Sequence, residues 1–155
     1  RRKEFDRAMD HYENALELDP KNNFALFGMG DCYRGKQDME SAVEWWDKIL
    51  DHEPDNQALW TRVGDALLSL DKIDEAVRHY ESSLQTGFDV FAYLGLARAE
   101  HARGNLEKAR EHCHMALENE ADNERILERL ALICEEAGDI EGAKEAKERL
   151  SKTAE

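Results

Sequence analysis

Residues 23–56 read NFALFGMGDCYRGKQDMESAVEWWDKILDHEPDN, and this arrangement of residue types returns along the chain at steps of 33 or 34 positions. The register is clearest at an alanine in the second half of each unit, which recurs as Ala8, Ala42, Ala76, Ala109 and Ala143. Mostly apolar residues follow each alanine at four and seven positions, the spacing of one helical face. A repeat of this length predicts a helical array whose units bury their apolar faces against one another.

Each unit is predicted to contain two helices. Small residues such as Gly30 and Ala42 let the two helices approach closely, and bulky residues such as Trp46 fill the gap to the next hairpin. Asp19-Pro20 and Glu53-Pro54 end a second helix, because the residue before a proline avoids the helical region. We expect nine helices, at about 3–18, 23–35, 39–52, 57–70, 73–86, 90–103, 106–119, 123–137 and 140–153.

The turns between helices carry boundary signals. The predicted helix stops are Gly35, Gly104 and Gly138, and the predicted N-caps that follow them are Asp38, Asn105 and Asp139. The loop at 85–89 is one residue shorter than its counterparts and lacks their proline, so we expect the stacking angle to differ there.

The repeated pattern resembles the tetratricopeptide repeat family over essentially the whole chain. The residues that match the family pattern most fully are Leu26, Met29, Gly30, Tyr33, Ala42, Trp46 and Pro54. The resemblance implies an all-α fold, a right-handed superhelical solenoid of antiparallel helix hairpins forming a single domain over residues 1–155. We expect a half repeat at 1–22 and full repeats at 23–56, 57–89, 90–123 and 124–155.

The composition argues against nucleic-acid and membrane partners. Lys and Arg number 21 against 35 Asp and Glu, and the formal net charge is −14. Such a field repels phosphate backbones and anionic lipid surfaces, and no apolar run is long enough to span a bilayer. Cys32, Cys113 and Cys134 fall on apolar helical positions and favour a reducing, cytoplasmic location. The chain begins at Arg1 without a methionine, so a leader or an anchor could precede this sequence.

His112-Cys113-His114 is the strongest metal motif in the sequence, because all three side chains can bind zinc or copper. Consecutive helical residues point about 100° apart, so the three side chains cannot converge on one ion, and Cys113 falls in the core position of its repeat. No activated nucleophile or glycine-rich phosphate loop is present either. We expect no metal, no cofactor and no enzymatic activity.

The family resemblance implies that the first helix of each hairpin lines a concave, peptide-binding surface. The predicted groove residues are Phe24, Phe27, Asp31, Arg34, Arg62, Asp65, Phe91, Leu94, Arg98, His101, Arg125 and Arg129. Their arginines predict a protein or peptide partner that is acidic or carries a carboxylate, with the phenylalanines as apolar anchors. The alternative is that these arginines pair with Asp31 and Asp65 of neighbouring hairpins.

Arg62 and Arg98 are expected to be central to this recognition. Gly28 and Gly95 occupy equivalent positions on either side of Arg62, and their missing side chains would let a ligand backbone approach that guanidinium.

Some family members clamp the C-terminal carboxylate of chaperones with Lys and Asn in the first of three helices, Asn in the second, and Lys and Arg in the third. The aligned positions here are Thr61, Asp65, Gly95, Arg125 and Arg129. Only the third helix resembles the clamp, so a chaperone-tail adaptor is not expected.

Residues 1–18 carry only the second helix of a hairpin. Phe5, Ala8, Tyr12 and Ala15 form an apolar stripe that a first helix would cover, so the chain is expected to be a fragment or to have this face covered by a partner or second copy. We therefore expect a non-enzymatic adaptor that binds a partner segment in its groove. The alternatives are a self-association module that uses Phe5 and Tyr12, and a regulatory domain of a larger protein.

Overall fold

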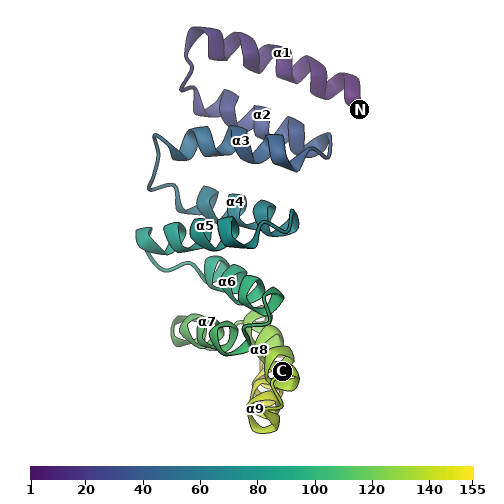
Figure 1. Ribbon diagram of the computed structural model, residues 1–155, viewed down its shortest axis with the longest axis vertical. Helices are drawn as coiled ribbons and strands as arrows, with labels where there is room; N and C mark the ends of the chain where they lie inside the picture. Colours follow the sequence, from purple (N-terminus) through teal and green to yellow (C-terminus); the bar gives the residue numbers. More distant parts are fainter.

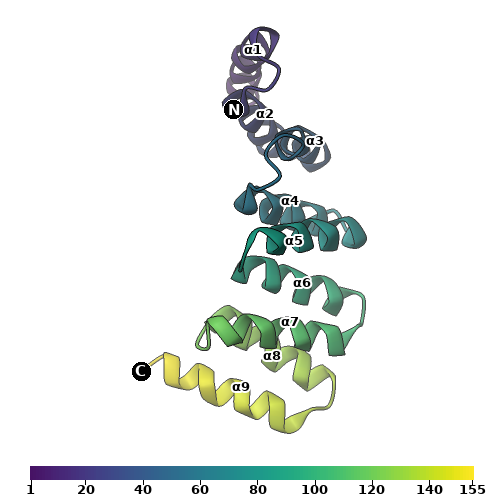
Figure 2. The same ribbon diagram turned by 90° about the vertical axis from the view of Figure 1, so that its left-hand side faces the viewer.

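The computed structural model describes all 155 residues. It contains nine α-helices and no strands. The helices are α1 (Arg2–Leu18), α2 (Asn23–Gly35), α3 (Met39–Leu50), α4 (Gln57–Ser69), α5 (Ile73–Thr86), α6 (Val90–Ala102), α7 (Leu106–Asn119), α8 (Glu124–Glu136) and α9 (Ile140–Thr153). They follow one another in an elongated stack, with the N-terminus at one end and α9 at the other (Figures 1 and 2). The predicted all-α solenoid is confirmed.

The stack consists of helix hairpins that each touch the next. Helices α2–α3, α4–α5, α6–α7 and α8–α9 form the hairpins, and α1 packs on α2 in front of them. The first helices α4, α6 and α8 also contact one another in sequence. No Cα atom of α2 lies within 8 Å of one in α4, so the first helices are farther apart there than elsewhere.

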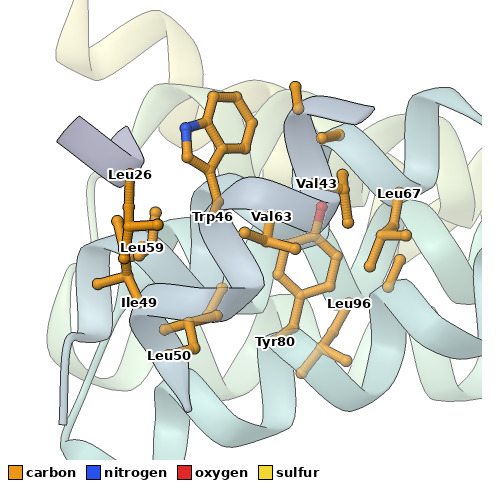
Figure 3. Packing of buried hydrophobic residues seen from close by; sticks show 14 residues of the cluster. Leu26, Val43, Trp46, Ile49, Leu50, Leu59, Val63, Leu67, Tyr80 and Leu96 are labelled. Carbon is orange, nitrogen blue, oxygen red and sulfur yellow. The ribbon is translucent and has the colours of Figure 1, made fainter. Parts of the chain in front are cut away.

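The core consists of aromatic rings seated on small residues. Trp46 of α3 and Tyr80 of α5 are 1% and 0% exposed and belong to one cluster that spans α2 to α6. Figure 3 shows Tyr80 beside Val63 and Leu96, with Trp46 of α3 in the same cluster. A second cluster joins α6 to α9. Burial of these side chains supplies the main stabilisation, at ~1.5–3 kcal/mol for each large apolar residue.

Three helices begin at the predicted N-caps. Asp38 and Asp139 accept hydrogen bonds from backbone N–H groups three residues later, whereas Asn105 begins α7 without such a bond. Gly104 and Gly138 have positive φ, as a helix stop requires.

The prediction for Gly35 was wrong. Gly35 is the last residue of α2, and the left-handed residue of that turn is Gln37, with φ 65°. Gly35 is instead a packing position, because a Cβ there would overlap the ring of Phe5.

A polar network closes the shortened loop. The Gln57 side-chain amide donates to the carbonyl oxygens of Ser83 and Gly87, at 3.2 and 2.9 Å. Thr61 and Ser83 hydroxyls both donate to Asp89 Oδ2, at 2.5 and 2.9 Å. These bonds tie α4, α5 and α6 together, whereas the α1–α2 and α3–α4 turns contain a proline. No helix in the structure combines the length and apolar character that crossing a membrane requires.

Candidate functional site

The predicted groove residues lie on α2, α4, α6 and α8, and every one of them lines a hollow on this face. The first hollow, about 990 Å³, lies over α1, α2 and α4, and the second, about 630 Å³, extends to Phe91 of α6. The third and fourth hollows, about 410 and 330 Å³, lie over α4, α6 and α8. Neighbouring hollows share lining residues, Arg34 and Arg62 in the first pair and Arg98 and Arg129 in the second. We call these four hollows together the groove.

Aromatic side chains dominate the α2 end of the groove. Phe24 is 77% exposed, and its ring stands edge-on to Tyr12 with the centroids 5.7 Å apart. The ring of Phe27 lies 6.3 Å from that of Trp46. The Arg62 guanidinium carbon is 5.0 Å from the Phe27 centroid and 5.9 Å from the Trp46 centroid. These three side chains reach across the wide gap between α2 and α4, and cation–π attraction holds them there.

Asp31 lies close to both arginines at this end. Its Oδ1 atom lies 3.2 Å from Arg34 Nη2 and 3.7 Å from Arg62 Nη1. The pairing with a neighbouring hairpin that the sequence left open as an alternative therefore holds for Arg62, whereas Arg34 pairs with Asp31 of its own helix. Arg62 is thus engaged by a carboxylate and two rings, and its central role in recognition stays a prediction.

Asp65 does not pair with an arginine. Its Oδ1 atom accepts a hydrogen bond from the Tyr80 hydroxyl at 2.6 Å. Burial, followed by this hydrogen bond, raises the pKa of Tyr80 above its ordinary value. The phenol is therefore neutral and donates to the carboxylate at physiological pH. Asp65 lines the second hollow, where the hydrogen bond from Tyr80 holds its carboxylate in place.

The α6–α8 end of the groove is cationic. No carboxylate oxygen lies within 4.0 Å of a side-chain nitrogen of Arg98, Arg125 or Arg129. Arg129 Nη1 donates to His101 Nδ1 at 3.3 Å, and His101 Nε2 meets Glu136 Oε2 at 2.5 Å.

The expectation for Gly28 and Gly95 was wrong. A Cβ at Gly28 would overlap the Tyr12 ring, and one at Gly95 would overlap the Tyr80 ring, so these spaces are already filled from the preceding helix. The equivalent position that follows Trp46 is Arg62, which lies over the indole instead. In both cases an aromatic ring at the end of one repeat fills the space over a glycine of the next helix. This pairing can be recognised in the sequence only once the packing is known.

The 112–114 segment separates as the helical geometry requires. Cys113 is fully buried, and burial raises the pKa of its thiol to about 12. His112 is half-buried with its ring 6.4 Å from that of Tyr93, and His114 is exposed. No group of three or more His, Cys, Asp or Glu side chains in the structure is arranged to hold a metal ion.

Phe5 and Tyr12 belong to α1, and their rings pack on α2. Both rings are half-buried against glycines of α2 and line the first hollow. The expectation that their stripe lacks any cover was therefore wrong in part. Tyr12 is nevertheless less buried than its counterparts Trp46 and Tyr80, which are almost completely covered. The stripe is covered on its α2 side and remains partly open on the other.

Asp89 is a groove residue that the prediction missed, and it lies beside Thr61. Both line the second hollow beside Phe91, and their hydrogen bond joins the floor of the groove to the shortened loop. The missing residue in that loop was the available signal, since it brings the α6 N-cap closer to α4.

Comparison with known proteins gives consistent matches. Two family models described as tetratricopeptide repeat match residues 1–61 and 90–133. The CTR9 homolog of Arabidopsis thaliana is 23% identical over 154 residues, 98% of this chain and 14% of that protein. The heat shock protein sti1 homolog of Schizosaccharomyces pombe is 30% identical over 84 residues, which cover 54% of this chain and 14% of that protein. The chain thus spans a small part of the length of these relatives.

Solved structures share the fold. The crystal structure of MamA is 22% identical, with a TM-score of 0.83, and the match covers 97% of this chain and 91% of that one. YrrB, described as a TPR protein with an unusual peptide-binding site, is 22% identical with a TM-score of 0.78, over 95% of this chain and 76% of that one. At this identity the likeness concerns the arrangement of the helices.

Proposed function

Because this chain belongs to the tetratricopeptide repeat family, we propose that it is a non-enzymatic adaptor that holds a segment of a partner protein in its concave groove. A repeat scaffold for protein interaction is the role common to the family and to relatives such as the CTR9 homolog and the corepressor ssn6. The finer claim concerns where the partner lies and what it carries.

The observation that carries the proposal is the exposure of aromatic rings in the first two hollows, which share Arg34 and Arg62. Phe24 and Phe91 are 77% and 58% exposed, yet each lines a hollow large enough for side chains of a peptide. Large apolar side chains that sit in concave surfaces beside arginines are typical of interaction sites. The partner is an extended or helical segment with at least one apolar anchor and acidic residues.

Two comparisons within the family bear on this proposal. YrrB is described as having an unusual peptide-binding site, which supports peptide binding by this fold without naming the residues here. A chaperone-tail clamp needs polar or basic donors on α4 and α6. Asp65, which accepts from Tyr80, would repel a terminal carboxylate there, and Gly95 offers no donor side chain.

The test uses exposed groove residues, because replacing them leaves the core intact. We expect Phe24→Ser with Phe91→Ser to abolish capture of a partner identified by pull-down and mass spectrometry. The matched control is Ile140→Ser, since Ile140 is 79% exposed but lies on α9 outside the groove. Retained binding by the groove variant, with loss in the α9 control, would place the partner elsewhere.

Self-association is the second candidate function, and the partly open stripe of α1 supports it. Phe5 and Tyr12 are half-buried where the equivalent residues of later repeats are enclosed, so a second copy would gain apolar burial there. Light scattering over a concentration series distinguishes the candidates. A concentration-dependent dimer that Phe5→Ser disrupts supports self-association, and a monomer at every concentration rejects it. If the chain is instead part of a larger protein's regulatory apparatus, the full-length sequence will reveal the additional domain.

A further inference from the structure

The groove is electrically divided. At its α2 end Asp31 pairs with both Arg34 and Arg62. At its α6–α8 end Arg98, Arg125 and Arg129 have no carboxylate within 4.0 Å, although the chain carries 35 acidic residues against 21 basic ones. We call these three residues the arginine cluster. An unpaired guanidinium keeps its planar array of donors available to a carboxylate from outside.

Two adjoining hollows surround the arginine cluster. Arg98 and Arg129 line both the third and the fourth hollow, and Arg125 lines the third. Leucines provide the apolar part of each lining, and one carboxylate lines each hollow, Glu128 in the third and Asp71 in the fourth. Neither of these carboxylates reaches an arginine of the cluster. Three positive side chains are thus arranged around two separate spaces.

Arg129 is held in place rather than free to swing. Its Nη1 atom donates to His101, which in turn meets Glu136. One of the five N–H donors of the guanidinium is used in this chain of contacts, and the others remain for a ligand. Fixing a guanidinium in advance reduces the conformational entropy that a partner would lose in binding it.

We propose that the arginine cluster binds two side-chain carboxylates from an acidic stretch inside the partner segment, one in each hollow. The apolar anchors of the same segment then lie toward Phe24 and Phe27, which sets the direction of the segment along the groove. The inference rests on the proposed groove function. It assigns the acidic part of the partner to α6 and α8 and not to Arg62.

Side-chain carboxylates fit this site better than a single chain end. Two hollows share the arginines, so two carboxylates can be paired at once, and both hollows are open troughs through which a chain can continue. Three steps between neighbouring first helices separate α2 from α8. The α4–α6 and α6–α8 steps are ~9 Å each, and the α2–α4 step is wider because those helices are not in contact, so the three steps together exceed ~27 Å, the reach of ~8 extended residues. A segment of about twelve residues is long enough to place its aromatic and acidic parts at opposite ends.

The test is selection from a library of random 12-residue peptides fused through their C-termini, so that no displayed peptide has a free carboxylate end. The baits are the parent chain, Arg98→Gln with Arg125→Gln, and the control Arg78→Gln. Both groove arginines are exposed, so their replacement leaves the core untouched. Arg78 is likewise exposed and without an ion-pair partner, but it lies on α5 and lines none of the groove hollows.

We expect the parent and the Arg78 control to select peptides with paired Asp or Glu residues at a distance from an aromatic residue, and the double variant to lose the acidic preference. A synthetic, amidated peptide from the parent selection should bind the double variant about tenfold or more weakly, and the salt dependence of its affinity should decrease. Circular dichroism verifies that each bait is folded.

The outcomes separate this inference from the proposed function. Acidic peptides that bind parent and double variant equally would overturn the inference, as would a selected sequence that binds as a synthetic free acid but not in its amidated form. If such peptides still require Phe24 and Phe91, the groove function stands while the arginine assignment fails. If the parent selects no peptide, or selected peptides ignore both phenylalanines and arginines, the groove function fails and the inference with it.

Discussion

Replacing Glu100 by leucine should stabilise the protein. Glu100 of α6 is 3% exposed and occupies the core position held by Leu67 and Cys134 in neighbouring repeats. Its Oε1 atom accepts from Arg103 Nη1 at 2.9 Å, but its Oε2 atom is buried without a hydrogen-bond partner. A buried polar atom without a partner is costly, so this carboxylate lowers the stability that an apolar residue would provide.

The magnitude follows from two opposing effects. Removing the orphan oxygen recovers ~1–3 kcal/mol, and leucine adds apolar burial at a position that already accepts it. The lost bond to Arg103 is a smaller effect, because that guanidinium is 32% exposed and keeps Asp74 as a partner. Replacing a whole buried ion pair by apolar residues is often neutral or stabilising by ~1–4 kcal/mol; here only Glu100 changes, and Arg103 stays partly exposed and paired with Asp74. We expect a gain of about 1–2 kcal/mol for Glu100→Leu.

The assay is urea unfolding monitored by circular dichroism, with thermal unfolding in parallel. A gain of this size shifts the thermal midpoint by about 2–8 °C in a chain of this length. Glu100→Gln is the matched control, because it removes the charge but keeps a polar group in the core and should gain less. Destabilisation of Glu100→Leu by 1 kcal/mol or more, on the order of one net hydrogen bond, would refute the reasoning and make Glu100 a stabilising partner of Arg103.

Three further predictions concern pH, packing and metal. Burial by itself lowers the pKa of His79, but its hydrogen bonds to Asp47 and to the Glu75 carbonyl oxygen outweigh burial and raise the pKa above the ordinary 6.5. A raised folded-state pKa contributes stability that is complete below 6.5 and lost as pH rises through the raised value. The urea midpoint of the parent should therefore fall over that window, and Asp47→Asn should flatten the dependence; a parent midpoint that rises there would contradict the assignment. Gly95→Ala should destabilise the fold by ~1–3 kcal/mol, because the added Cβ overlaps the Tyr80 ring, and an unchanged thermal midpoint would show that the ring moves aside. A chelator should leave the circular dichroism and thermal midpoint unchanged, whereas a loss of stability would point to a metal at the 112–114 segment.

The sequence by itself determined the helices and their pairing into hairpins. Ala42, Ala76 and Trp46 occupy repeated positions because each repeat buries the same face against the same kind of neighbour, so one-dimensional periodicity carries the fold. The groove face followed for the same reason, since a residue's place in the repeat decides which side of its helix is covered. The turns after the helices were predicted less well. Gln37, and not Gly35, has the left-handed conformation after α2, which shows that a residue other than glycine can take this position.

Only the tertiary structure decided which groove residues are available to a partner. Arg62 and Arg98 look alike in the sequence, but Arg62 meets Asp31 and two rings across the α2–α4 gap, whereas Arg98 meets no carboxylate. Gly95 looks like open space until the Tyr80 ring from the preceding helix is seen to fill it. These differences arise from contacts between repeats, which depend on side-chain directions and helix separations. Periodicity assigns a residue to a face, and packing alone decides what that residue touches.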